Sequence, residues 1–122
     1  MSEFVLRKLP QNADVRGVLT VLEKDMPFAV VRTFWVNSPD GAIRGGHRHH
    51  RTRQALVAVH GEVEVYMNDG QHEKTIILDN AGLMLVVEPE DWHTMKFQPG
   101  AVLLVMASHV FDLDDYIGGK YA

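Results

Sequence analysis

Residues 54–70, Gln54-Ala-Leu-Val-Ala-Val-His-Gly-Glu-Val-Glu-Val-Tyr-Met-Asn-Asp-Gly70, decide the fold class of this chain. The segment from Gln54 to His60 is mostly apolar, which is typical of a strand buried on both faces. Residues 62–67 then alternate between polar and apolar side chains, as in a strand with one buried face. The Asn-Asp-Gly that follows predicts a hairpin turn, because Asp-Gly tolerates the positive φ of tight turns.

Short segments rich in β-branched and aromatic residues recur along the rest of the chain, at spacings of about 8–12 residues. Further strands are expected at Val18–Leu22, Phe28–Val36, Thr75–Leu78, Leu83–Glu88 and Ala101–Ser108, with turns at Asp79–Gly82 and Gln98–Gly100. No segment before residue 108 shows a helical stripe of ten or more residues, and residues 111–117 are expected to form a helical turn or an edge strand. This pattern predicts an all-β fold, with a jelly-roll β-barrel as the leading architecture.

The composition indicates one globular domain, residues 1–122. Hydrophobic residues make up 46% of the chain, which is enough for a core. The net charge of −4 argues against a broadly basic nucleic-acid binder. Because the chain contains no cysteine, a disulfide scaffold, a cysteine zinc site and a cysteine nucleophile are excluded.

No segment of the sequence is expected to enter a membrane or to direct secretion. The longest apolar run, Ala101–Ala107, is far shorter than the roughly 20 residues of a spanning helix. The first seven residues lack the charged-then-apolar order of a signal peptide. We therefore expect a cytoplasmic protein.

The main chemical feature is a histidine cluster, Gly45-Gly-His-Arg-His-His50. Residues two apart in a strand share a face, so His47 and His49 should point the same way and His50 the opposite way. A later segment, Pro89-Glu-Asp-Trp-His93, supplies a third histidine. We expect His47, His49 and His93 to converge in the mouth of the barrel.

Converging histidines either bind a metal or move protons. A facial-triad metal centre needs a carboxylate beside its two histidines. Gln54, which follows His49 after four intervening residues, instead offers an amide, which is a weak ligand. This favours acid–base chemistry, for which the pKa of histidine is suited, but leaves a three-histidine zinc site open.

Several motifs occur in a characteristic order along the chain. They are Asp14-Val-Arg-Gly17, Pro27-Phe28, Arg32, Arg44-Gly-Gly-His-Arg-His49, Gln54–Gly61, Asn68-Asp-Gly70, Trp92-His93, Leu103–Ser108 and Asp115-Tyr-Ile117. Together they resemble the sugar-nucleotide 3,4-ketoisomerases, the WxcM-like family. The spacing from Gly41 to Gly61 is also similar to the first motif of the wider cupin superfamily, with Gln54 where metal-binding cupins carry Glu.

The resemblance implies a cupin-type jelly-roll barrel that uses no metal or other cofactor. It implies a homodimer with exchanged N-terminal strands, and no nucleic-acid or membrane partner. The substrate would be a dTDP-linked 4-keto-6-deoxyhexose, dTDP-4-keto-6-deoxyglucose, which is converted to its 3-keto isomer. The product would feed an aminotransferase that makes a 3-amino sugar for a surface polysaccharide or a natural product.

This resemblance and the chemistry of the reaction assign roles to residues. We expect His49 to remove the proton from C3 and His47 to move the hydroxyl proton between oxygens. Arg44 is expected to stabilise enolate charge, and Arg16 and Arg32 to hold the diphosphate. The remaining candidates for substrate binding are Trp35 and Trp92, by stacking, together with Gln54 and His93.

Two other function classes stay open from the sequence. One is a small metal-dependent cupin enzyme that uses His47, His49 and His93. The other is a non-catalytic, sugar-binding cupin module. Metal analysis separates the first from the ketoisomerase, and a test for turnover separates the second.

Overall fold

The computed structural model describes residues 2–122, whose regular secondary structure is β-strand except for one short 3-10 helix. The elements are β1 (Leu6–Lys8), β2 (Gln11–Asp14), β3 (Gly17–Thr20), β4 (Arg32–Ser38), β5 (Ile43–His49), β6 (Gln54–His60), β7 (Val63–Asn68), β8 (Glu73–Leu78), β9 (Leu83–Val87), β10 (Trp92–Phe97), β11 (Ala101–Ala107), the 3-10 helix η1 (Leu113–Asp115) and β12 (Tyr116–Ile117). Within these residues, no helix has the length and apolar character needed to span a bilayer.

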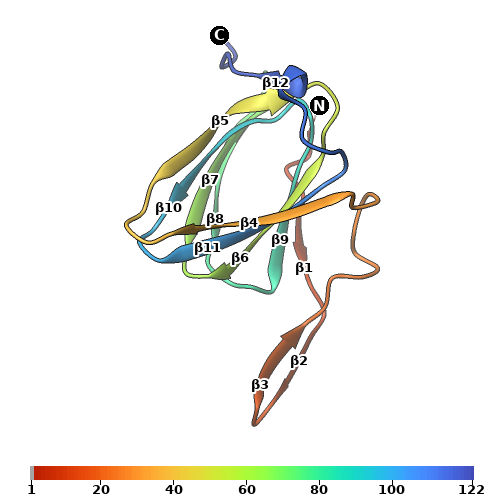
Figure 1. The fold of residues 1–122 in the computed structure, drawn as a ribbon, viewed down its shortest axis with the longest axis vertical. Coiled ribbons are helices and arrows are strands. Elements are labelled where there is room, and N and C mark those ends of the chain that lie inside the picture. Colours follow the sequence, from red (N-terminus) through yellow and green to blue (C-terminus); the bar gives the residue numbers. More distant parts are fainter. Residues whose placement is uncertain (1) are drawn as a thin grey trace.

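Two five-stranded sheets form the body of the molecule (Figure 1). The first has the order β1-β9-β6-β11-β4, and the second has the order β12-β5-β10-β7-β8. Every pair of neighbouring strands in them is antiparallel. Two antiparallel sheets with these crossovers make a jelly roll, so the predicted all-β class and jelly-roll architecture are confirmed.

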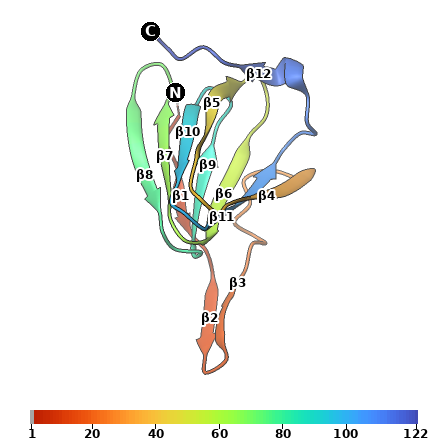
Figure 2. The same ribbon diagram turned by 60° about the vertical axis from the view of Figure 1, so that its left-hand side comes forward.

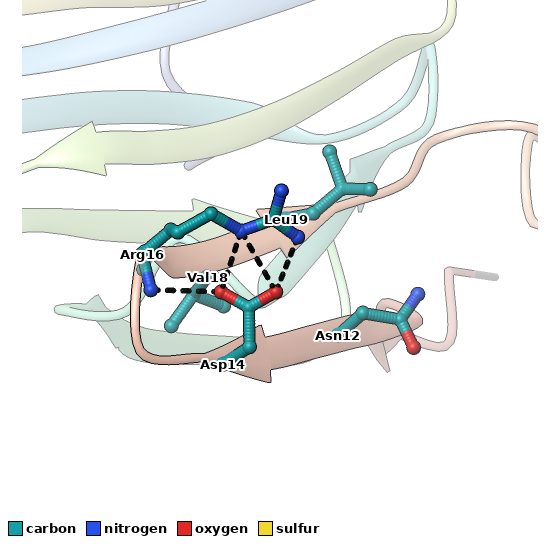
Figure 3. A pocket seen from close by; sticks show the side chains of 6 residues that line it. Asn12, Asp14, Arg16, Val18 and Leu19 are labelled. Carbon is teal, nitrogen blue, oxygen red and sulfur yellow. Dashed lines mark hydrogen bonds and ion pairs between the residues drawn. The ribbon is translucent and has the colours of Figure 1, made fainter.

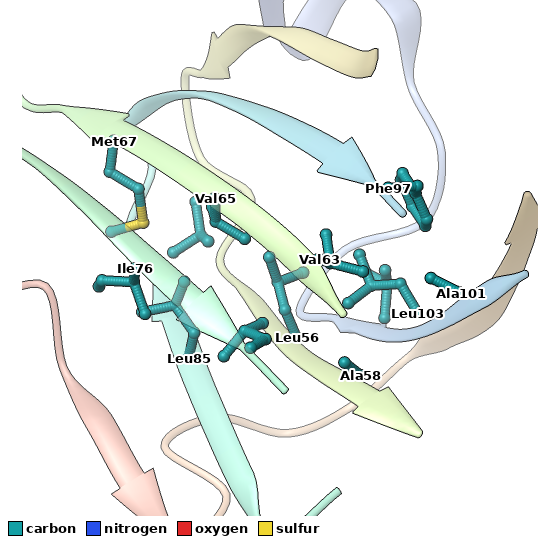
Figure 4. Close-up of a cluster of buried hydrophobic side chains, with 13 residues drawn as sticks. Leu56, Ala58, Val63, Val65, Met67, Ile76, Leu85, Phe97, Ala101 and Leu103 are labelled. Carbon is teal, nitrogen blue, oxygen red and sulfur yellow. The ribbon is translucent and has the colours of Figure 1, made fainter. Parts of the chain in front are cut away.

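Strand β6 explains why the sequence pattern was informative. Leu56 and Ala58 face the interior between the sheets, whereas Ala55 and Val57 belong to a second apolar cluster outside the first sheet. The strand is thus buried on both faces, as its continuous apolar character predicted. The interior cluster draws on most strands of both sheets (Figure 4).

The second apolar cluster lies under the N-terminal segment. It also contacts residues that were predicted to begin a strand. The strand expected at Phe28–Val36 begins only at Arg32. Phe28 packs against this outer cluster, and the carbonyl of Pro27 accepts a hydrogen bond of 2.9 Å from Arg53. The chain before Arg32 is therefore held as a loop on the outside of the sheet.

The N-terminal part was expected to exchange strands with a neighbouring subunit, and in a single chain this exchange stays a prediction. Strand β1 pairs with β9 of the same chain, with Leu6 opposite Leu85. The strand expected at Val18–Leu22 is instead β3, which pairs only with β2. This β2–β3 hairpin projects away from the two sheets (Figures 1 and 2).

Candidate active site

A cavity of about 440 Å³ opens between the two sheets. Its walls come from β4 and β11 of the first sheet, β5 and β10 of the second, and the C-terminal segment. The predicted site residues among those that line it are Arg32, Trp35, Arg44, His47, Gln54 and His93. Its apolar lining includes Phe34, Met95 and Leu103. A mostly apolar cavity with a few converging polar groups is typical of a small-molecule site.

A β-bulge at Gly45-Gly46 places the histidines of β5. His47 lies opposite His93, but Gly45 lies opposite Thr94, so β5 has one extra residue at this point. Gly45 and Gly46 have φ values of +90° and +81°, which glycine adopts readily. A Cβ on Gly45 would lie 2.8 Å from the carbonyl oxygen of His93, so glycine also permits the close approach of β10.

The three predicted histidines are neighbours. The ring centroid of His47 is 4.9 Å from that of His49 and 5.0 Å from that of His93. The His49 and His93 centroids are 6.2 Å apart. His47 lines the cavity itself, whereas His49 lies behind it and lines an adjoining crevice. The expected shared face of His47 and His49 is therefore present in the structure.

Burial keeps these imidazoles neutral. It lowers the pKa of His49 to about 4, with a further lowering from His47 that Asp115 opposes. Burial likewise lowers the pKa of His93 to about 4, and it lowers the pKa of His47. Near pH 7 each ring has a free lone pair, which a general base requires.

The hydrogen bonds of His93 define its tautomer. Its Nδ1 lies 3.0 Å from the carbonyl oxygen of Asp91, which only accepts, so Nδ1 carries the proton. Its Nε2 is then an acceptor, and it is buried without a partner among residues 2–122. Unsatisfied buried acceptors are rare in folded proteins and are found at functional sites. His93 thus presents a fixed acceptor within the histidine cluster.

Two arginines give the cavity a positive charge that the chain as a whole lacks. Arg32 stacks over Phe34 at 4.4 Å and over Phe111 at 5.4 Å. Neither Arg32 nor Arg44 has an ion pair within residues 2–122. The described residues that line the cavity include no Asp or Glu. The cavity is therefore suited to an anionic ligand.

Tyr116 is a site residue that the sequence analysis did not select. It follows η1 and pairs with His49 across β12 and β5. Its ring centroid is 4.4 Å from that of His47 and 4.9 Å from that of His49. It also lines the cavity. The signal was present in the Asp115-Tyr-Ile117 motif, but nothing in the sequence placed that motif beside the histidines.

The structure does not bring Trp92 to the cavity. Its indole N–H donates a 3.0 Å hydrogen bond to the carbonyl oxygen of Gly118, and Lys120 lies over its ring at 5.6 Å. Its other ring contact is with Tyr66, at 6.2 Å. Trp92 and His93 are adjacent in a strand, so they point to opposite faces, and only His93 faces the interior. Trp92 therefore does not line the cavity, and its stacking on substrate stays a prediction.

Arg16 also lies outside the cavity of its own chain. It sits at the tip of the β2–β3 hairpin, where its guanidinium contacts Asp14 at 2.5 Å (Figure 3). This contact raises the pKa of Arg16 and lowers that of Asp14. An open depression of about 300 Å³ lies along this hairpin. It contains none of the histidines, so the chemistry belongs to the cavity between the sheets.

The donor set does not fit a facial-triad metal centre. Gln54 is buried beside the histidines and supplies an amide where that centre needs a carboxylate. Within residues 2–122, no three His, Asp or Glu side chains are arranged to hold a metal ion.

Comparisons with known proteins agree with this geometry. Residues 2–121 match the FdtA family, described as WxcM-like, C-terminal. The chain is 36% identical over 108 residues to TDP-4-oxo-6-deoxy-alpha-D-glucose-3,4-oxoisomerase of Aneurinibacillus thermoaerophilus, covering 85% of this chain and 78% of that protein.

Two solved structures have nearly the same fold. A 3,4-ketoisomerase from Helicobacter canadensis superposes with a TM-score of 0.90 at 32% identity, covering 98% of this chain and 92% of that one. A variant of the 3,4-ketoisomerase QdtA from Thermoanaerobacterium thermosaccharolyticum, in complex with TDP-4-keto-6-deoxyglucose, gives 0.89 at 32% identity, covering 98% and 89%.

The fold and the site thus define a cupin-type jelly roll with a histidine-lined, positively charged cavity. Within that class, the chain belongs to the FdtA family of WxcM-like proteins. The family resemblance predicted from the ordered sequence motifs is confirmed.

Proposed function

We propose that this protein is an isomerase that converts dTDP-4-keto-6-deoxyglucose to the dTDP-linked 3-keto-6-deoxyhexose. The observation that carries the proposal is the cavity, which is lined by His47, His93 and two arginines without ion pairs, with His49 directly behind it and all three histidines neutral. The names of the relatives support the same reaction class. A non-catalytic binding module would not need a buried base kept neutral near pH 7.

The reaction needs one base at carbon and one shuttle between oxygens. His49 takes the C3 proton, which the C4 carbonyl acidifies, and becomes an imidazolium as an enediolate forms. His47, on the cavity wall, moves the C3 hydroxyl proton to the oxygen on C4. The His49 imidazolium then protonates C4, so the carbonyl is left at C3 and both histidines return to their starting state.

The other cavity residues hold the substrate. Arg32 and Arg44 bind the anionic groups of the substrate, because one guanidinium group can donate two parallel hydrogen bonds to phosphate oxygens. His93 accepts a hydrogen bond from the substrate through Nε2, and Gln54 offers its side-chain amide to the substrate. Trp35, at the rim and 69% exposed, has a free ring face on which a base or sugar can stack.

The protein would work as a homodimer in which the β2–β3 hairpin reaches the neighbouring subunit. Val18 and Leu19 are consecutive residues of β3 and are 62% and 63% exposed, so this hairpin leaves a large apolar side chain uncovered on each of its faces. The hairpin projects away from the two sheets in both views (Figures 1 and 2), and Arg16, in its turn, does not line the cavity of its own chain. In a dimer the predicted diphosphate contact of Arg16 would be made in the partner's cavity.

Mixed dimers test this arrangement. Arg16→Ala and His49→Asn proteins should each lose activity, but co-refolded chains should regain part of it. One site of the mixed dimer then combines a native Arg16 from one chain with a native His49 from the other. Absence of any regain, or a monomer by light scattering at micromolar concentration, would contradict the dimeric site.

Removal of metals tests the proposed chemistry against the metal-dependent cupin alternative. Protein treated with a chelator and then dialysed should convert dTDP-4-keto-6-deoxyglucose at the same rate as untreated protein. The product can be followed by NMR of the sugar protons. Activity that disappears on treatment and returns with zinc, iron or manganese would contradict the proposal.

The cytoplasmic location, the single domain over residues 1–122 and the use of the product by an aminotransferase stay predictions.

A further inference from the structure

Asp115 is a buried carboxylate beside His49 to which the reaction above assigns no role. It is 5% exposed and lies at the end of η1, directly before Tyr116. Its Oδ1 accepts hydrogen bonds from the backbone N–H groups of His50 at 3.1 Å and Arg51 at 2.8 Å. Its Oδ2 accepts a hydrogen bond from the hydroxyl of Thr52. Asp115 therefore fixes the turn that directly follows His49.

The backbone of Asp115 also links the C-terminal segment to the turn after His49. Its carbonyl oxygen accepts a 2.9 Å hydrogen bond from the N–H of His50. The next residue, Tyr116, pairs with His49, and its ring contacts that of His47 in a tilted arrangement and that of His49 edge to face. Side chain and backbone together hold the tyrosine against the histidine pair.

Asp115 also bears the negative charge that acts on His49. Burial tends to raise the pKa of Asp115, but the hydrogen bonds from Thr52 and Arg51 outweigh it and lower that pKa, so the group is ionised near pH 7. His49 and Asp115 line a common crevice of about 10 Å³ behind the cavity. The other titratable or charged groups that face His49 or this crevice are His47, His93, Tyr116, Arg32, His109 and Asp112.

Among these groups, Asp115 is distinguished by both charge and burial. Asp112 is the other carboxylate at the crevice, but it is only partly buried, and its charge is offset by Arg51 at 2.9 Å. The neighbouring His47 disfavours a positive charge on His49. The imidazolium that forms when His49 takes a carbon proton is thus stabilised mainly by Asp115.

We propose that Asp115 is the positioning residue of the carbon base: it fixes the turn after His49, holds Tyr116 on both imidazoles, and supplies the charge that stabilises the His49 imidazolium. This inference rests on the proposed function for its catalytic part. Its structural and electrostatic part concerns His49 in the free protein and is testable without substrate.

The test compares Asp115→Asn with Asp114→Asn. Asparagine keeps an oxygen that accepts from the backbone but removes the charge, and Asp114 is an exposed residue of the same short helix. We expect Asp115→Asn to lower kcat by about 10-fold with KM and the Kd for dTDP unchanged, because a less stabilised imidazolium is a weaker base. The acidic limb of its kcat/KM profile should move to lower pH, and Asp114→Asn should match the native protein.

A titration of the histidine resonances by NMR provides the readout that is independent of activity. In Asp115→Asn the pKa of His49 should fall below its native value, since the carboxylate that raises this pKa is gone. If Asp115→Asn does not fold, Thr52→Val should give a smaller loss of kcat in the same direction. If native protein lacks isomerase activity, the proposed function fails, and the titration still decides the role of Asp115.

Three results would overturn the proposal. The first is a His49 pKa that is the same in Asp115→Asn, Asp114→Asn and native protein. The second is a rise in KM and in the Kd for dTDP with kcat unchanged, which would make Asp115 a binding residue. The third is an equal loss of kcat in both variants, which would indicate a general effect of charge on the C-terminal segment.

Discussion

Replacement of His49 by Asn should abolish turnover and carbon–proton exchange together, with a loss of at least ~10²-fold in kcat. His49 is 3% exposed, and its pKa of about 4 leaves it neutral near pH 7, ready to accept the C3 proton. Asparagine has a similar polarity but cannot take a proton in this range. The measurement is the rate of 3-keto product formation, together with loss of the C3 proton signal in deuterated water.

The matched control for this variant is His60→Asn. His60 lies at the exposed end of β6, outside the cavity, so its replacement should leave turnover near the native rate. The His49→Asn protein should still bind dTDP, because Arg32 and Arg44 remain. Near-native turnover by His49→Asn would show that another group is the carbon base.

Replacement of His47 by Asn should also reduce turnover by roughly 10²-fold, but with a different signature. His47 lines the cavity, whereas His49 lies behind it, which suits His47 to proton transfer between substrate oxygens. The carbon base remains in this variant, so slow exchange of the C3 proton should persist while product formation falls. The ratio of exchange to product formation, measured by NMR on the same sample, separates the two roles.

Two outcomes would contradict this division of labour. If His47→Asn loses exchange and turnover equally, His47 takes part in removal of the carbon proton. If it retains full turnover, the oxygen shuttle is another group, and Tyr116, whose ring lies 4.4 Å from that of His47, becomes the first candidate.

Local sequence patterns were sufficient for most of the fold. The continuous apolar run of β6 and the alternation of β7 follow directly from burial on two faces and on one face. Strand β10 was not predicted, because its sequence Trp-His-Thr-Met-Lys-Phe mixes polar and apolar residues on both faces. Its buried inward face carries the polar His93, which belongs to the site. Its outward face carries the apolar Trp92, which contacts the C-terminal segment. Both residues break the polar–apolar alternation expected of a strand with one buried face.

The site was predictable where it depends on spacing and unpredictable where it depends on distant segments. The shared face of His47 and His49 follows from their positions in one strand. Their spacing in the sequence does not predict where Trp92, Arg16 and Tyr116 lie, because the position of each depends on which segment covers it or pairs with it. The tail covers Trp92, the projecting hairpin carries Arg16, and β12 brings Tyr116 to the histidines.

The most direct test of the central claim is incubation of the protein with dTDP-4-keto-6-deoxyglucose in deuterated water. Transfer through histidine and an enediol predicts a 3-keto product that carries deuterium at C4, because the imidazolium exchanges its proton with solvent. Mass spectrometry gives the deuterium content and NMR its position. Recovery of the starting sugar with neither conversion nor exchange, or a product without deuterium on carbon, would contradict the account.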